Sequence, residues 1–125
     1  NTFTFSNPAE SVFLGWHAAA AGYDGYLRWA YNSWVKDAWH DSRFRTWPAG
    51  DCCLVYPAGS SIRMKRLVEG IQDFEKIRIL RAELKGDKHN RLNATVEKFA
   101  PVEVGPEVDV ERMVAEGRKQ LRSLE

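Results

Sequence analysis

The long segment 61–84, SIRMKRLVEGIQDFEKIRILRAEL, restricts the fold of this chain more than any other feature of its sequence. Apolar side chains recur in it at the spacing of one face of an α-helix. The positions on this face are Leu67, Ile71, Phe74, Ile77 or Arg78, Leu80 or Arg81, and Leu84. Ser60 or Ser61 stands before the segment and can cap its first turn. The pattern therefore predicts a long amphipathic helix.

Three other segments also carry helix signals. Residues 9–22 are rich in alanine and end at Gly22, a residue type that commonly terminates helices. A shorter helix is expected around residues 92–99. Asp109 is a good capping residue for a last amphipathic helix that ends near Leu124.

Three further segments are rich in residues that favour β-strands, namely 2–5, 25–31 and 51–57. Residues 35–50 carry polar, proline and glycine residues without clear periodicity, which indicates a long loop. In chain order the strands alternate with crossover segments, and this order is typical of a parallel sheet.

We therefore expect an α/β fold with about three parallel strands and crossover helices, followed by C-terminal helices. Residues 1–100 are expected to contain the βα units, and residues 101–125 a linker and the terminal helix. Such a chain could fold alone or form the last third of a larger barrel, and the residue pattern fits both alternatives.

The charged residues are spread along the chain and nearly balance, with 18 Lys and Arg against 17 Asp and Glu. A surface for nucleic acid or membrane would concentrate one sign of charge, so we expect neither partner. No apolar run approaches the roughly 18 residues of a membrane-spanning helix. The chain begins with Asn1 instead of methionine, and we expect it to be a processed or excised piece.

The sequence lacks the short motifs of nucleophile elbows, zinc proteases, P-loops and dinucleotide-binding folds. Its three histidines share no ligand spacing, and the adjacent Cys52 and Cys53 suit neither a disulfide nor a zinc site. We expect no metal and no cofactor. Glu69 and Asp73 lie one helical turn apart, and we expect them on a solvated or salt-bridged helix face.

The segment 24–34, DGYLRWAYNSW, holds four aromatic residues, one arginine and one asparagine. In parallel α/β folds, ligands bind at the carboxyl ends of strands and on the loops that follow. Aromatic rings pack on the C–H faces of sugars, while amide groups hydrogen-bond to sugar hydroxyls. We therefore predict that carbohydrate binds to residues near these strand ends and in the long loop, namely Asn32, Trp34, Tyr56, Trp29 and Trp47.

A packing role is the alternative for part of this segment. Alternation along the predicted strand places Leu27, Trp29 and Tyr31 on one face, and Arg28 and Asn32 on the other. We expect Leu27 to pack against helices, and for Trp29 both alternatives stay open. Arg28, if buried, needs an acidic partner that the sequence does not identify.

Several motifs follow one another in a specific order: GYLRWAYNSW, DSRFRTWPAGD, LVYP, SSIR and RLVEGIQDFEKIRIL. The segment before them reads NTFTFSNPAESVFLGWHAAAAGYDG. In these motifs the chain resembles the C-terminal part of the catalytic domain of glycoside hydrolase family 123. The resemblance spans about residues 1–85.

This resemblance implies a (β/α)8 TIM barrel, of which the chain would form about the last third. It also implies an exo-acting β-N-acetylgalactosaminidase, in which the acetamido group of the substrate is the nucleophile. In that family an adjacent Asp-Glu pair assists the reaction, with the glutamate as general acid/base. No adjacent Asp-Glu occurs in these 125 residues, so we expect no catalytic residue here and no hydrolysis by the chain alone.

The expected partner is thus an N-acetylhexosamine-type carbohydrate. Exposed sheet edges would also favour self-association or pairing with the missing part of the barrel. The resemblance implies a periplasmic, cell-surface or secreted location. The alternative function is that of a non-catalytic structural or carbohydrate-binding domain.

Overall fold

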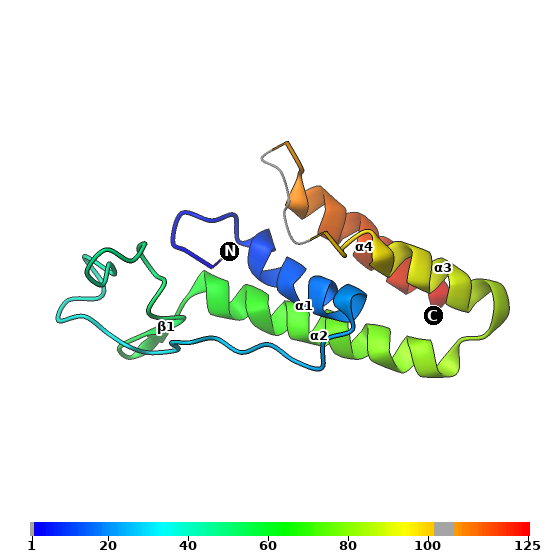
Figure 1. The fold of residues 1–125 in the computed structure, drawn as a ribbon, viewed down its shortest axis with the longest axis horizontal. Helices are drawn as coiled ribbons and strands as arrows, with labels where there is room; N and C mark the ends of the chain where they lie inside the picture. Colours follow the sequence, from blue (N-terminus) through cyan, green and yellow to red (C-terminus); the bar gives the residue numbers. More distant parts are fainter. Residues whose placement is uncertain (1, 102–106) are drawn as a thin grey trace.

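The computed structural model describes residues 2–101 and 107–125. In this part of the chain the helices are α1 (Ala9–Ala21), α2 (Ile62–Glu83), α3 (Gly86–Glu97) and α4 (Val110–Leu124). The strands β1 (Val55–Tyr56) and β2 (Gly59–Ser60) pair as a short antiparallel hairpin. The connection from α1 to α2, residues 22–61, runs back toward the end of the molecule where α2 begins and forms irregular loops there (Figure 1). We call this connection the loop layer.

The helices begin and end at residues that favour these positions. The Ser61 side chain caps α2 by accepting a hydrogen bond from the backbone N–H of Met64, 3.0 Å away. Asp109 caps α4 in the same way through the N–H of Arg112 at 3.0 Å. Gly22 ends α1 in the left-handed conformation with φ of 72°. The four predicted helices are confirmed, although α3 begins at Gly86, six residues before the segment 92–99 expected for it, and ends at Glu97.

Helices α1 and α2 cross at a backbone contact between Gly15 and Gly70. A Cβ atom on Gly15 would lie 2.0 Å from the carbonyl oxygen of Gly70. A Cβ atom on Gly70 would lie 2.7 Å from the carbonyl oxygen of Val12. Only glycine allows the two helices to approach this closely.

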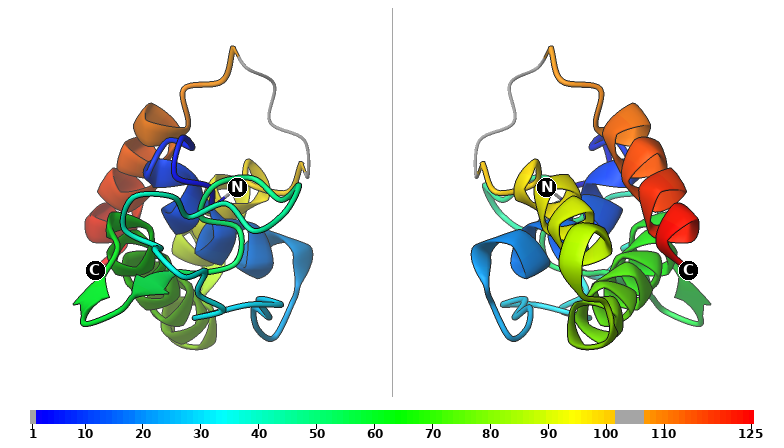
Figure 2. Two further views of the ribbon diagram at one scale, coloured as in Figure 1. Left: turned by 90° about the vertical axis from the view of Figure 1, so that its left-hand side faces the viewer. Right: turned by 90° about the vertical axis from the view of Figure 1, so that its right-hand side faces the viewer.

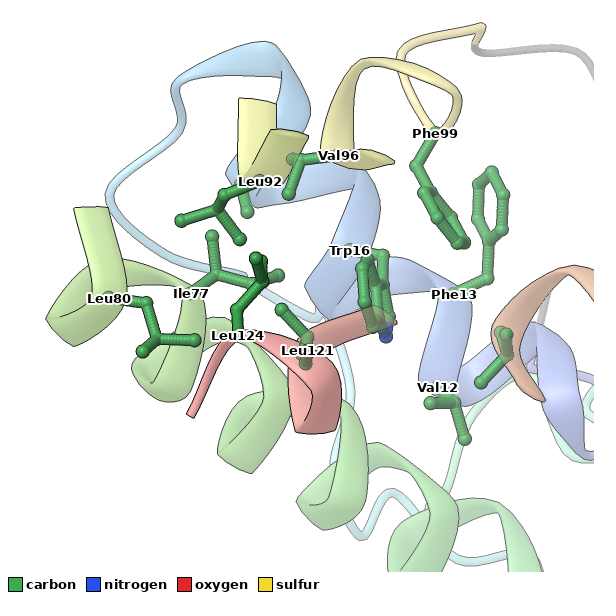
Figure 3. Close-up of a cluster of buried hydrophobic side chains, with 12 residues drawn as sticks. Val12, Phe13, Trp16, Ile77, Leu80, Leu92, Val96, Phe99, Leu121 and Leu124 are labelled. Carbon is green, nitrogen blue, oxygen red and sulfur yellow. The ribbon is translucent and has the colours of Figure 1, made fainter. Parts of the chain in front are cut away.

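The core lies where α1 contacts the other three helices. Figure 2 shows the helices end-on, with α1 among them. Trp16 of α1 stacks on Phe99 with 4.5 Å between the ring centroids (Figure 3). All four helices contribute to the buried cluster around this stack. Its members are Val12, Phe13, Trp16, Ala19, Ile77, Leu80, Leu92, Val96, Phe99, Val114, Leu121 and Leu124.

The buried face of α2 differs from the predicted face in two ways. Ile71 was expected on the apolar face, yet it is 48% exposed, because Gly70 occupies the helix crossing. Two charged residues, Arg63 and Asp73, lie on the buried face instead. Both side chains have hydrogen-bond partners. Arg63 donates to the carbonyl oxygen of Thr2, and Asp73 accepts from Arg118.

The prediction of an α/β fold with three parallel strands is wrong for the described residues. Segments 2–5 and 25–31 form no strand, and segment 51–57 contributes only β1 to an antiparallel hairpin. Strand-forming residues fit a pleated surface with neighbouring strands, and here no parallel neighbour is present for them. The helices pack on one another instead, so the described chain is mainly helical and contains no third of a barrel.

The long loop expected at 35–50 is confirmed, since these residues form turns without regular structure. The expected boundary between residues 100 and 101 stays a prediction, and much of the expected linker falls on 102–106, outside the described residues. Within the described chain, no helix has the length and apolar character needed to cross a membrane.

Candidate functional site

The loop layer is held together by a short antiparallel contact between residues 31–34 and 52–55. The N–H of Leu54 donates to the carbonyl oxygen of Tyr31 at 2.8 Å, and that of Ser33 donates to Cys52 at 3.0 Å. Asn32 and Cys53 form a bridge in the same antiparallel sense. The two segments that were expected to run parallel therefore meet in the opposite direction.

Trp29 and Trp47 form a ring pair within this layer. Their ring centroids are 5.2 Å apart, and the rings are tilted by 35°. The indole Nε1 of Trp29 donates to Asp51 Oδ2 at 3.2 Å, and Arg28 Nη2 donates to Asp51 Oδ1 at 3.0 Å. Asp51 is thus the acidic partner that the sequence did not identify for Arg28. Its buried carboxylate positions the first ring of the pair.

Tyr56 stacks on Trp39 with 4.7 Å between the ring centroids, and the two rings border a pocket of about 400 Å³. Arg63 is another of the residues that line this pocket. Its Nη2 donates to the Tyr56 hydroxyl at 3.3 Å, and its carbon Cζ lies 5.9 Å from the Tyr56 ring centroid. This pocket lies beside the first turn of α2.

Asn32 and Trp34 lie next to the hairpin. The indole Nε1 of Trp34 donates to the carbonyl oxygen of Val55 at 2.7 Å. Trp34 is still 43% exposed. The side chain of Asn32 is exposed and makes no hydrogen bond within residues 2–101 and 107–125. Its amide is therefore available to a ligand.

The predicted residues form three neighbouring groups and do not surround one hollow. Trp29 contacts Trp47, Tyr56 contacts Trp39, and Trp34 contacts the backbone of β1. Of the five predicted side chains, Tyr56 is the one that lines the pocket beside α2. We refer to the five predicted residues together as the aromatic surface, of which Tyr56 borders the pocket.

Tryptophan exposure separates this surface from the core. Trp16 is fully buried, whereas the other four tryptophans of the chain are between 43% and 60% exposed. The expected packing of Leu27 against helices is wrong, because this side chain is 89% exposed. Without a pleated sheet, alternation no longer places it on an inner face.

Two residues of the site, Arg63 and Asp51, were not predicted from the sequence. Arg63 is only 4% exposed, and its Nη1 donates to the carbonyl oxygens of Thr2 and Gly50 at 2.7 Å. A signal for it exists, because Arg63 stands four residues before Leu67 on the helical repeat. A charged residue in line with an apolar helix face is a candidate for a buried, specific role.

Two exposed acid–base pairs lie in the loop. A hydrogen bond from Arg43 lowers the pKa of Asp41 to about 2. A hydrogen bond to Asp37 raises the pKa of His40 above its ordinary value. Both carboxylates are therefore engaged by cations and poorly suited to donate a proton near neutral pH.

Glu69 and Asp73 of α2 are salt-bridged, which is one of the two alternatives expected for them, but Asp73 lies on the buried face of the helix. Arg118 of α4 donates to Asp73 at 2.8 Å and to Glu69 at 3.1 Å. Cys52 and Cys53 are free and buried, and burial raises the pKa of the Cys52 thiol. Among the described residues, no cluster of His, Cys, Asp and Glu has the arrangement of a metal site.

Comparison with known protein families matches residues 1–80 to the glycoside hydrolase 123 catalytic domain. The chain belongs to glycoside hydrolase family 123. The match covers the N-terminal segment, α1, the whole loop layer and most of α2, and it confirms the family expected from the sequence motifs. A comparison with curated proteins found no match.

Proposed function

We propose that this family 123 chain supplies a carbohydrate-binding surface for an N-acetylhexosamine-type sugar. The residues of this surface are Asn32, Trp34, Tyr56, Trp29 and Trp47. The observation that carries the proposal is the exposure of four tryptophans between residues 29 and 47. Such rings are costly to leave in water and rarely gather on one surface segment without a ligand or partner.

The chemistry of the surface suits a sugar. Indole and phenol rings cover the apolar C–H face of a pyranose, and their exposed edges leave room for its hydroxyl groups. The free amide of Asn32 can donate to one hydroxyl and accept from another. Trp29 and Trp34 are held by hydrogen bonds through their indole N–H groups, so their rings are oriented before a ligand arrives.

Under this proposal the chain by itself does not cleave the glycosidic bond. An adjacent Asp-Glu pair is implied by the family resemblance, and the sequence has none. Two carboxylates of the loop between α1 and α2, Asp51 and Asp41, are bound to arginines. The chain should therefore release no nitrophenol from a nitrophenyl N-acetylgalactosaminide, and release above the buffer rate would contradict this part of the proposal.

Isothermal titration with N-acetylgalactosamine tests the binding itself. We expect measurable binding that Trp34→Ala weakens by about tenfold, the scale of one lost stacking ring. The matched control is Tyr23→Ala, which removes an aromatic side chain of similar exposure outside the proposed surface. Equal affinities for the wild type and Trp34→Ala would refute the assignment of this surface.

Leu27 favours a second candidate function, association with another copy of the chain. A leucine that is 89% exposed beside the half-exposed Trp29 presents apolar area that a contact would remove from water. Sedimentation velocity should show a concentration-dependent rise in mass that Leu27→Ser reduces. A single monomeric species at every concentration would contradict this candidate.

A further inference from the structure

We infer that the pocket between the Trp39–Tyr56 stack and the start of α2 binds an oxyanion group, sulfate or carboxylate, carried on a sugar. This inference rests on the proposed function for the sugar part of the ligand. The pocket has a volume of about 400 Å³. The residues that line it include Trp39, Tyr56, Arg63, Thr4, Ser42 and Ser61.

Arg63 brings a full positive charge to this wall. It is 4% exposed, and its partners are two carbonyl oxygens and the Tyr56 hydroxyl. These neutral acceptors hold the guanidinium in place but leave its charge uncompensated. No carboxylate among the described residues forms an ion pair with Arg63. Buried charges are normally paired, so the pocket lacks a counter-ion that a ligand can provide.

The first turn of α2 adds to the positive potential. Ser61, Ile62 and Arg63 line the pocket, and the first turn contains no acidic residue. The Ser61 hydroxyl is already engaged with Met64 and Leu54. The backbone N–H groups of Ile62 and Arg63 have no acceptor within residues 2–101 and 107–125. Free N–H groups at the start of a helix bind anions.

No negative charge in the wall opposes an anion. None of the residues that line the pocket is Asp or Glu. His40 lies at the rim with Asp37 2.9 Å from its Nδ1, so a protonated imidazole there is neutralised by its neighbour. The charge that the pocket offers is therefore that of Arg63 and the helix start. Trp39, 60% exposed, extends beside it as a surface for the sugar ring.

Isothermal titration of the whole chain with matched ligands tests the inference. We expect N-acetylgalactosamine 6-sulfate or galacturonate to bind about tenfold more tightly than neutral N-acetylgalactosamine. Added salt should lower the affinity for the charged sugars more than that for the neutral sugar. Which of the two charged sugars binds more tightly identifies the oxyanion. Equal affinities for the charged and neutral sugars would overturn the inference.

Inorganic sulfate separates this inference from the proposed function. We expect sulfate alone to bind more weakly than the sulfated sugar, because it lacks the ring that packs on Trp39 and Tyr56. Equal binding of both would refute the sugar part of the ligand and the proposed function together. It would leave only an anion pocket.

A charge placed at the rim provides the decisive variant. Ile62 is 57% exposed, lines the pocket and is the first residue of α2. A carboxylate at the first position of a helix stabilises the helix, so Ile62→Glu should keep the wild-type melting temperature. Its negative charge should weaken the binding of the charged sugar by about tenfold. The control is Ile79→Glu, on the same helix, 46% exposed and outside the pocket wall. Wild-type affinity in Ile62→Glu would overturn the inference.

Discussion

Asp73 connects three helices through one carboxylate. The indole Nε1 of Trp16 in α1 and the Nε of Arg118 in α4 each donate to its Oδ2 at 2.8 Å. The residue is only 9% exposed, so few water molecules can replace these partners. A charge on the buried face of α2 is therefore part of the packing between α1, α2 and α4.

We predict that Asp73→Ala lowers the free energy of unfolding by about 2–3 kcal/mol, because it leaves the Trp16 indole N–H without its acceptor and the Arg118 guanidinium with Glu69 as its remaining partner. Urea denaturation followed by circular dichroism measures the change. Glu75→Ala is the matched control, since Glu75 pairs with Arg78 on the exposed face of the same helix. Such a surface pair contributes little. A loss no larger than that of the control would show that the network does not stabilise the fold.

Glu69 should make stability depend on pH. Burial raises the pKa of Glu69, but hydrogen bonds from Arg118 and Arg66 outweigh it and lower the pKa below the ordinary 4.5. The ionised form therefore stabilises the fold above pH 4.5, and this contribution is lost as the pH falls through the lowered value.

Relative to Glu69→Gln, the wild type should thus be more stable at pH 7, and the difference should shrink as the pH falls below about 4.5. Thermal unfolding of both proteins across this pH range measures it. Glu83→Gln, an exposed residue near the end of α2, serves as the control and should show no such trend. A difference that stays constant with pH would rule out the depressed pKa.

At the scale of elements, the α1–α2 crossing decides how close these two helices pack. Gly15 and Gly70 bring the two backbones into direct contact, and no side chain separates them there. This approach lets Trp16 reach Asp73 on α2 and Phe99 beyond α3. The short helix separation and the buried network therefore depend on each other.

Gly70→Ala should lower the free energy of unfolding by about 1–2 kcal/mol. Its Cβ atom would lie 2.7 Å from the Val12 carbonyl oxygen, and this overpacking outweighs the better helix propensity of alanine. Gly25→Ala is the control, because nothing lies within 4 Å of a Cβ atom at that position. A Gly70→Ala protein as stable as wild type would contradict the close crossing.

At the scale of the whole molecule, the helices could be predicted from the sequence and the sheet could not. Ser61, Gly22 and Asp109 act locally, so capping and periodicity identify helix ends without knowledge of the rest of the fold. A strand depends on a partner elsewhere in the chain. Segment 25–31 has the composition of a strand, but in the described chain only Tyr31 at its end has a backbone hydrogen-bond partner in another segment.

The candidate surface was also predicted only in those features that depend on local sequence. The aromatic residues themselves could be chosen from the sequence, because their clustering along the chain is visible there. Their groupings could not, since the pairs Trp29–Trp47 and Tyr56–Trp39 depend on how the loop folds back. Asp51 and Arg63 were missed because their roles arise only from contacts with residues distant in the chain.

The most direct test of carbohydrate binding follows the indole N–H signals of the five tryptophans by NMR while N-acetylgalactosamine is added to the ¹⁵N-labelled chain. The account predicts saturable shifts of the Trp29, Trp34 and Trp47 signals. Trp16, buried and bonded to Asp73, should not shift and acts as an internal control. Signals of Trp29, Trp34 and Trp47 that remain unchanged at high sugar concentration would contradict the central claim.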